Sequence, residues 1–123
     1  MSHALIILGH GSRNPAATTQ FHDLVAQLRA HREGPVYPAF MELAEPSLTD
    51  VVADAIADGA DEVVVQPCFL FDGMHMRRDI PGMLTAFAAQ HPGVVFRFGG
   101  PLGPDARIAD ILLERAAEAT CLG

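Results

Sequence analysis

The stretch ALIILGHGSRN at residues 4–14 decides the fold class of this chain. Its first five residues form a short, continuous apolar run, which is typical of a strand buried on both faces of a parallel sheet. Gly9 ends the run, and a polar loop leads to Pro15, which suits the first turn of a helix. From Pro15 to about Arg32 the apolar residues have helical spacing. The opening of the sequence therefore predicts a strand, a loop and a helix in that order.

The same unit of strand and helix recurs three more times. Further strands are expected at residues 36–41, 62–70 and 94–98, and further helices at residues 47–59, 79–90 and 105–119. Four consecutive units of this kind predict a parallel sheet with right-handed connections and helices on both faces. We therefore expect an α/β fold: a three-layer sandwich around a four-stranded parallel sheet, in a single domain that covers residues 1–123.

Composition excludes several classes of protein. The chain has 123 residues and a net charge of −7, which argues against a general nucleic-acid binder. All of its basic residues are arginine, so a Schiff-base lysine and a phosphate-loop lysine are excluded. The sequence contains no apolar run near the ~20 residues that cross a bilayer. Residues 1–8 lack the features of a secretory signal, and we expect a cytoplasmic protein.

Three potential metal ligands follow three of the predicted strands. His10 comes after the first strand, Glu42 after the second, and His75 in the loop after the third. The carboxyl ends of parallel strands meet at one edge of a sheet, where ligands of such folds bind. Two imidazoles and a carboxylate at that edge predict an open site for Co²⁺, Ni²⁺, Fe²⁺ or Zn²⁺.

Arginines gather at the same predicted edge. Arg13 follows His10, and Arg77 with Arg78 precedes a helix start, where the helix dipole alone would disfavour positive charge. These guanidinium groups are candidates for binding an anionic ligand, because they pair with carboxylates in bidentate fashion. Surface pairing of Arg77 and Arg78 with Asp72 or Asp79 is the alternative.

Each site residue also has an ordinary interpretation. A single histidine after a strand usually bonds to its own loop, and Glu42 and Glu45 are alternatively solvated loop acids. His3, His22, His31 and His91 are interpreted as structural. Cys68 and Cys121 lack the spacing of a thiolate metal site, and a disulfide between them has little support. The glycines near His10 do not make a nucleotide-binding motif, because Asn14 stands where the third glycine belongs.

Longer motifs surround these residues and occur in a specific order. They are residues 8–13, 40–42 with 46–48, 67–71 with 73–75, 78–81, and 103–105. Together they resemble the short-form class II chelatases, which are sirohydrochlorin cobaltochelatases with ferrochelatase and nickel-chelatase relatives. The resemblance runs over nearly the whole chain, and the ordered set is far more specific than the tetrapeptide His-Gly-Ser-Arg alone.

The resemblance implies a chelatase-like fold and insertion of a divalent metal into sirohydrochlorin, a lyase reaction of siroheme or cobalamin synthesis. By motif match, His10 and His75 would bind the metal and accept pyrrole protons, and Glu42 would help to hold the metal. Arg13, Arg77 and Arg78 become candidates for binding the peripheral carboxylates of the tetrapyrrole.

The resemblance also bears on metal, cofactor and assembly. Co²⁺ is favoured as the substrate metal, with Fe²⁺ or Ni²⁺ as alternatives, and no permanent cofactor is expected. A short form is expected to be a homodimer. Two other functions stay open: a metal or tetrapyrrole carrier without turnover, and a histidine-dependent phosphohydrolase. The second would need an arginine directly before His10, where this chain has Gly9.

Overall fold

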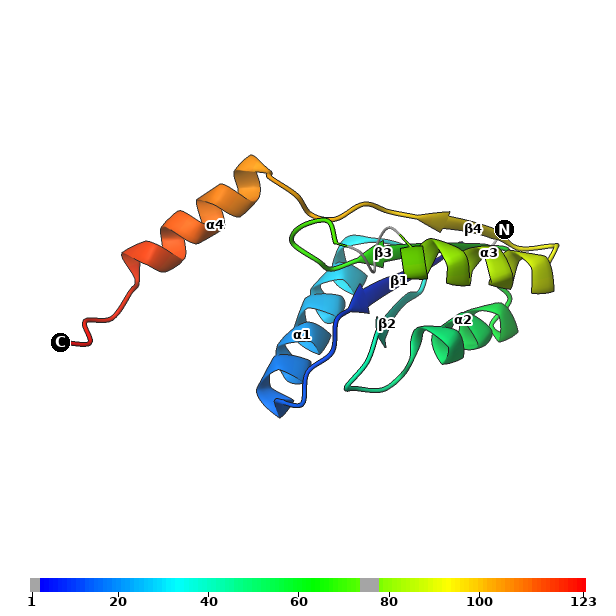
Figure 1. Ribbon diagram of the computed structural model, residues 1–123, viewed down its shortest axis with the longest axis horizontal. Helices are drawn as coiled ribbons and strands as arrows, with labels where there is room; N and C mark the ends of the chain where they lie inside the picture. The colour runs from blue at the N-terminus through cyan, green and yellow to red at the C-terminus, as the bar shows by residue number, and fades with distance from the viewer. Residues whose placement is uncertain (1–2, 74–77) are drawn as a thin grey trace.

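Strands and helices alternate along the whole chain in the computed structural model, which describes residues 3–73 and 78–123 (Figure 1). The elements are β1 (His3–Gly9), α1 (Pro15–His31), β2 (Val36–Phe40), α2 (Leu48–Ala57), β3 (Glu62–Pro67), α3 (Ile80–Gln90), β4 (Val95–Phe98) and α4 (Ala106–Ala117). All eight were predicted in this order. The largest difference is at β3, which ends at Pro67 instead of residue 70. Its ladder with β1 stops at the Leu8–Pro67 pair, with one further hydrogen bond from Cys68 N to Leu8 O.

The four strands form one parallel sheet in the order β2-β1-β3-β4. Leu5 of β1 lies opposite Val36 of β2 on one side and Val64 of β3 on the other. The predicted parallel sheet is therefore confirmed. The chain passes outward from β1 to β2 and then returns to β3 on the far side of β1, so the order of strands reverses at the β1–β3 pair. Ligands of such folds bind beyond the carboxyl ends of the strands at this position.

Helices cover both faces of the sheet, as predicted. Ile6 and Leu8 of β1 point into the larger apolar cluster, which includes Val52 of α2 and Leu84 of α3. On the opposite face, Ile7 joins a smaller cluster with Val25 of α1. The side chains of β1 alternate between these two clusters with the two-residue period of a strand. Burial of β1 on both faces explains its continuous apolar sequence.

The last helix does not share in this core. Asp105 caps α4, with its side chain accepting a hydrogen bond from Arg107 N at 2.9 Å, which agrees with the predicted start of the helix. However, α4 contains no buried residue, and it leads away from the sheet (Figure 1). The sandwich therefore consists of the sheet with α1 on one face and α2 and α3 on the other. No helix of the described residues is both long and apolar enough to span a membrane.

A network of side-chain contacts joins three strands at the amino edge of the sheet. Glu62 of β3 contacts His3 of β1 and accepts a hydrogen bond from Arg97 of β4 at 3.0 Å. The hydrogen bond from Arg97 is the main reason that the pKa of Glu62 is lowered from its ordinary value, and the contact with His3 adds to the effect. The folded state thus favours the ionised carboxylate.

This network makes a prediction about acid stability. A carboxylate with a lowered pKa in the folded state stabilises the fold above its unfolded pKa, and this contribution disappears as the pH falls through the folded pKa. The free energy of unfolding of the wild type should therefore exceed that of Glu62→Gln near about pH 6, and the difference should shrink towards about pH 3. Urea unfolding of both proteins at a series of pH values measures this difference in the free energy of unfolding. A difference that does not change with pH would show that the charge of Glu62 is not responsible.

Candidate metal centre

His10 and Glu42 lie side by side at the carboxyl edge of the sheet. The pairing of β1 with β2 continues past the ends of both strands, through hydrogen bonds from Met41 N to Gly9 O at 2.9 Å and from Glu42 N to His10 O at 3.2 Å. This extension of the ladder brings His10 Nε2 to 3.5 Å from Glu42 Oε1. The structure thus places together two of the three side chains that the sequence suggested as metal ligands.

Gly11 permits the close approach of the two loops. Its φ is +103°, and a Cβ atom built at this position would lie 1.6 Å from the carbonyl oxygen of Glu42. Glycine is therefore required here for its conformation and for its lack of a side chain. Gly9 is also restricted, because a Cβ atom there would lie 2.9 Å from the ring of Phe21. Sequence reasoning used Gly9 to end the first strand and rejected a nucleotide-binding motif here, but it did not predict the close approach of the two loops at Gly11.

The loop that carries Glu42 folds back tightly onto β2. Phe40 N donates to the carbonyl oxygen of Pro46 at 2.9 Å, and Phe40 forms an isolated bridge with Ser47. Within the loop, Leu43 adopts a positive φ of 63°, and the Glu45–Pro46 peptide is cis. Ser47 then caps α2 by accepting a hydrogen bond from Asp50 N. Glu42 is thus presented from a short loop that is fixed at both ends.

Both side chains of the pair are open to solvent. The side chain of His10 is 60% exposed and that of Glu42 is 63% exposed. The ring of Phe69, which follows β3, meets the His10 ring edge to face with centroids 5.7 Å apart. This contact restricts the imidazole on one side and leaves its nitrogens accessible. Sequence reasoning did not single out Phe69, although its place directly after a central strand was the available signal.

Two of the predicted site residues lie outside the described part of the chain. These are His75 and Arg77. Arg13 lies in the loop between His10 and α1, and Arg78 precedes the N-cap of α3; both are exposed. Within residues 3–73 and 78–123, no three His, Cys, Asp or Glu side chains come together in a way that could hold a metal ion. The described part of the site is therefore the His10–Glu42 pair.

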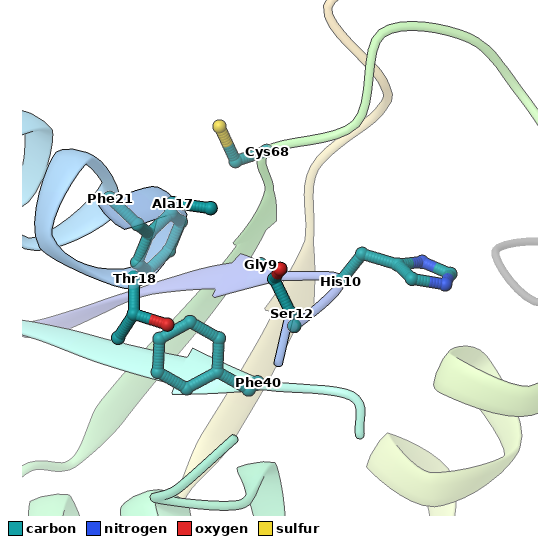
Figure 2. A pocket seen from close by; sticks show the side chains of 9 residues that line it. Gly9, His10, Ser12, Ala17, Thr18, Phe21, Phe40 and Cys68 are labelled. Atoms are coloured by element: carbon teal, nitrogen blue, oxygen red, sulfur yellow. The ribbon is translucent and has the colours of Figure 1, made fainter. Parts of the chain in front are cut away.

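A hollow of about 200 Å³ adjoins His10 between the sheet and α1. Its walls include Thr18, Phe21, Phe40 and Cys68, and Figure 2 shows the His10 ring pointing away from these side chains. Burial raises the pKa of the Cys68 thiol, so Cys68 is protonated near neutral pH and is a poor metal ligand. Cys68 and Cys121 are both free thiols, as the sequence suggested. The candidate metal-binding groups, the His10 imidazole and the Glu42 carboxylate, therefore lie outside this hollow.

The fold and the carboxyl edge of the sheet define a class of protein. It is a parallel α/β domain with an exposed histidine and an exposed carboxylate beyond the ends of its strands. A sequence model of the CbiX protein family matches residues 4–119. This chain belongs to the CbiX family.

Relatives of two different lengths are similar to the chain. The chloroplastic sirohydrochlorin ferrochelatase of Arabidopsis thaliana is 36% identical over 112 residues, which are 90% of this chain and 50% of that protein. The sirohydrochlorin cobaltochelatase of Methanosarcina acetivorans is 32% identical over 94% of this chain and 95% of its own length. The chain thus spans half of the first relative and nearly all of the second.

Solved structures have the same fold. A CbiX protein of Marinobacter aquaeolei, described as a putative cobalamin biosynthesis protein, is 35% identical with a TM-score of 0.78, over 95% of this chain and 99% of its own. The sirohydrochlorin chelatase SirB of Bacillus subtilis, solved in complex with cobalt, is 28% identical with a TM-score of 0.89. That match covers 96% of this chain and 51% of SirB. The chelatase fold expected from the sequence is therefore confirmed.

The contact at Gly11 makes a second prediction. Replacing Gly11 with alanine should lower the free energy of unfolding by about 2 kcal/mol or more, because alanine disfavours the positive φ and its methyl group would collide with the Glu42 carbonyl. Gly82→Ala in α3 is the matched control, since a Cβ atom there meets nothing within 4 Å. The control should be neutral or slightly stabilising. Urea unfolding of both variants compares them, and equal stabilities would contradict the role given to Gly11.

Proposed function

We propose that this chain is a sirohydrochlorin metal chelatase that inserts a divalent metal ion into the macrocycle. The observation that carries the proposal is the His10–Glu42 pair, with 3.5 Å between nitrogen and oxygen at the carboxyl edge of the sheet. Membership of the CbiX family supports the same conclusion, as do the names of relatives that act as cobaltochelatases and ferrochelatases. The metal is a substrate in this reaction, and no permanent cofactor is needed.

Insertion needs a site that holds the metal loosely and leaves room for pyrrole nitrogens. A neutral imidazole and a carboxylate suit this task, because both bind first-row divalent ions and occupy only part of the coordination sphere. The high exposure of His10 and Glu42 leaves the remaining positions accessible to a flat ligand. We assign His75, which lies outside the described residues, as the third metal ligand on the basis of its motif.

The macrocycle must lose two pyrrole protons as the metal enters. A histidine at the site can accept a proton as a general base, because its ordinary pKa is about 6.5. We assign this role to whichever of His10 and His75 is not bound to the metal when the proton is released. Arg13 and Arg78 are exposed near the same edge, and with Arg77 they are proposed to pair with the peripheral carboxylates of the substrate. They supply local positive charge in a chain whose net charge is −7.

Three finer points belong to the same proposal. Co²⁺ is the favoured metal, and Fe²⁺ or Ni²⁺ are the alternatives. The alternatives stay open because imidazole and carboxylate ligands do not select one of these ions by affinity alone. The enzyme is proposed to work in the cytoplasm, as a homodimer of single-domain chains. Its pathway is the synthesis of siroheme or of cobalamin.

Catalysis is tested directly with sirohydrochlorin. Purified protein is mixed with sirohydrochlorin and Co²⁺, Fe²⁺ or Ni²⁺, and the change in absorption is followed against a protein-free control. We expect many turnovers per chain, fastest with Co²⁺. Tight binding without turnover would indicate a carrier instead, and insertion no faster than the control would refute the proposal. Release of phosphate from p-nitrophenyl phosphate would revive the phosphohydrolase alternative.

Substitutions test the roles assigned to the site residues. His10→Ala and His75→Ala should each lower the rate of insertion about 100-fold, the scale of a lost general base or ligand. Glu42→Gln keeps the shape of the side chain and removes its charge, so the concentration of metal needed for half-maximal rate should rise. His31→Ala is the control, because His31 bonds to Gln27 O at the far end of α1. Equal rates in the wild type and all four variants would contradict the site assignment.

A further inference from the structure

The loop after β3 holds the backbone of Phe69 in a fixed place beside the candidate metal centre. Cys68 N donates a hydrogen bond to Leu8 O of β1 at 2.8 Å. On the other side, Leu102 N, from the segment after β4, donates to Phe69 O at 2.8 Å. The hydrogen bonding of the sheet thus continues past the end of β3, and it fixes the point from which the Phe69 side chain starts.

The Phe69 side chain is anchored in the core. It is half-buried and packs against the larger apolar cluster, which also holds Leu8 of β1 and Leu84 of α3. Its ring meets the His10 ring edge to face, with the centroids 5.7 Å apart and the planes inclined at 63°. One aromatic side chain therefore connects the packed interior of the domain to the imidazole of the candidate metal ligand.

Two contacts orient the His10 ring. Within residues 3–73 and 78–123, its polar and aromatic side-chain contacts are the ion pair with Glu42 and the ring contact with Phe69. Glu42 is itself 63% exposed, so the ion pair alone does not fix the imidazole. Figure 2 shows the ring directed away from the side chains of the hollow beside α1. An exposed histidine samples several staggered rotamers unless packing selects one, and the Phe69 ring is the packing contact present here.

We propose that Phe69 is a positioning residue for metal capture, because its ring selects the rotamer of His10 that directs Nε2 towards Glu42. With the imidazole held in this rotamer, 3.5 Å from the carboxylate oxygen, an arriving metal ion meets both ligands as a ready-made pair. Little rotamer freedom of His10 is then lost on binding. Phe69 acts through His10. This inference rests on the proposed function, since it concerns how the same pair receives the metal.

Positioning has a signature that packing alone lacks. The ring of Phe69 directs Nε2 towards Glu42, so its loss should matter most while the carboxylate is present to share the metal. The effects of Phe69→Leu and Glu42→Ala on metal affinity should therefore not add, as is usual for residues that act as one unit. A general loss of packing would instead weaken the site by the same factor with and without the carboxylate.

A measurement without metal tests the positioning itself. Three-bond couplings between the α and β protons of His10, measured by NMR, should show one dominant rotamer in the wild type and averaging among rotamers in Phe69→Leu. Phe69→Met, which fills more of the volume of the ring, should behave like Phe69→Leu. Phe98→Leu is the matched control, because Phe98 packs against the same cluster from β4, which β3 separates from β1. An averaged rotamer in the wild type, or a single rotamer kept in both Phe69 variants, would overturn the proposal.

Calorimetric titration with Co²⁺ alone gives the second readout. Phe69→Leu should raise the Kd for Co²⁺ about 10-fold, the scale of residues that orient a metal ligand, and Phe98→Leu should change it by less than about twofold. In a Glu42→Ala background, Phe69→Leu should raise the Kd by less than about threefold. Equal factors in both backgrounds would overturn the proposal, as would a wild type that binds no Co²⁺. Binding and coupling as expected, without turnover of sirohydrochlorin, would refute the chelatase function and leave the role of Phe69 in metal binding intact.

Discussion

Strand β1 is the constraint on which the rest of the molecule depends. It is hydrogen-bonded to β2 on one edge and to β3 on the other, and its side chains point alternately into the two apolar clusters. A strand held on four sides has little freedom, so the loop that follows it starts from a fixed place. His10 is the first residue of that loop. The position of the candidate metal ligand is therefore set by the most rigid part of the sheet.

The transition from core to site takes place within a few residues. Leu8 is fully buried, whereas His10, two residues further, is largely exposed. Two more hydrogen bonds of the β1–β2 ladder bridge this transition and bring the Glu42 loop alongside. Gly11 makes the approach possible by having no side chain. An exposed pair on a rigid support is suited to a ligand that must arrive, exchange and leave, because the pair needs no rearrangement to become accessible.

The two ends of the sheet have different roles. At the amino edge, Glu62 links three strands through its contact with His3 and its ion pair with Arg97. At the carboxyl edge, the chain instead has the exposed side chains of His10 and Glu42 and a hollow beside α1. The ion pair of Glu62 thus lies at the edge where no ligand is expected, and the candidate site lies at the edge where ligands of such folds bind.

The sequence by itself determined the order of elements, the parallel sheet and the edge at which His10 and Glu42 appear, because apolar periodicity and strand ends are local properties of the chain. Only the tertiary structure decided that these two side chains meet, that Gly11 must be glycine and that Phe69 contacts His10, since each depends on residues distant in sequence. The same holds for α4. Its helical pattern was readable from the sequence, but whether its apolar face found a place on its own sheet depended on packing, and it did not.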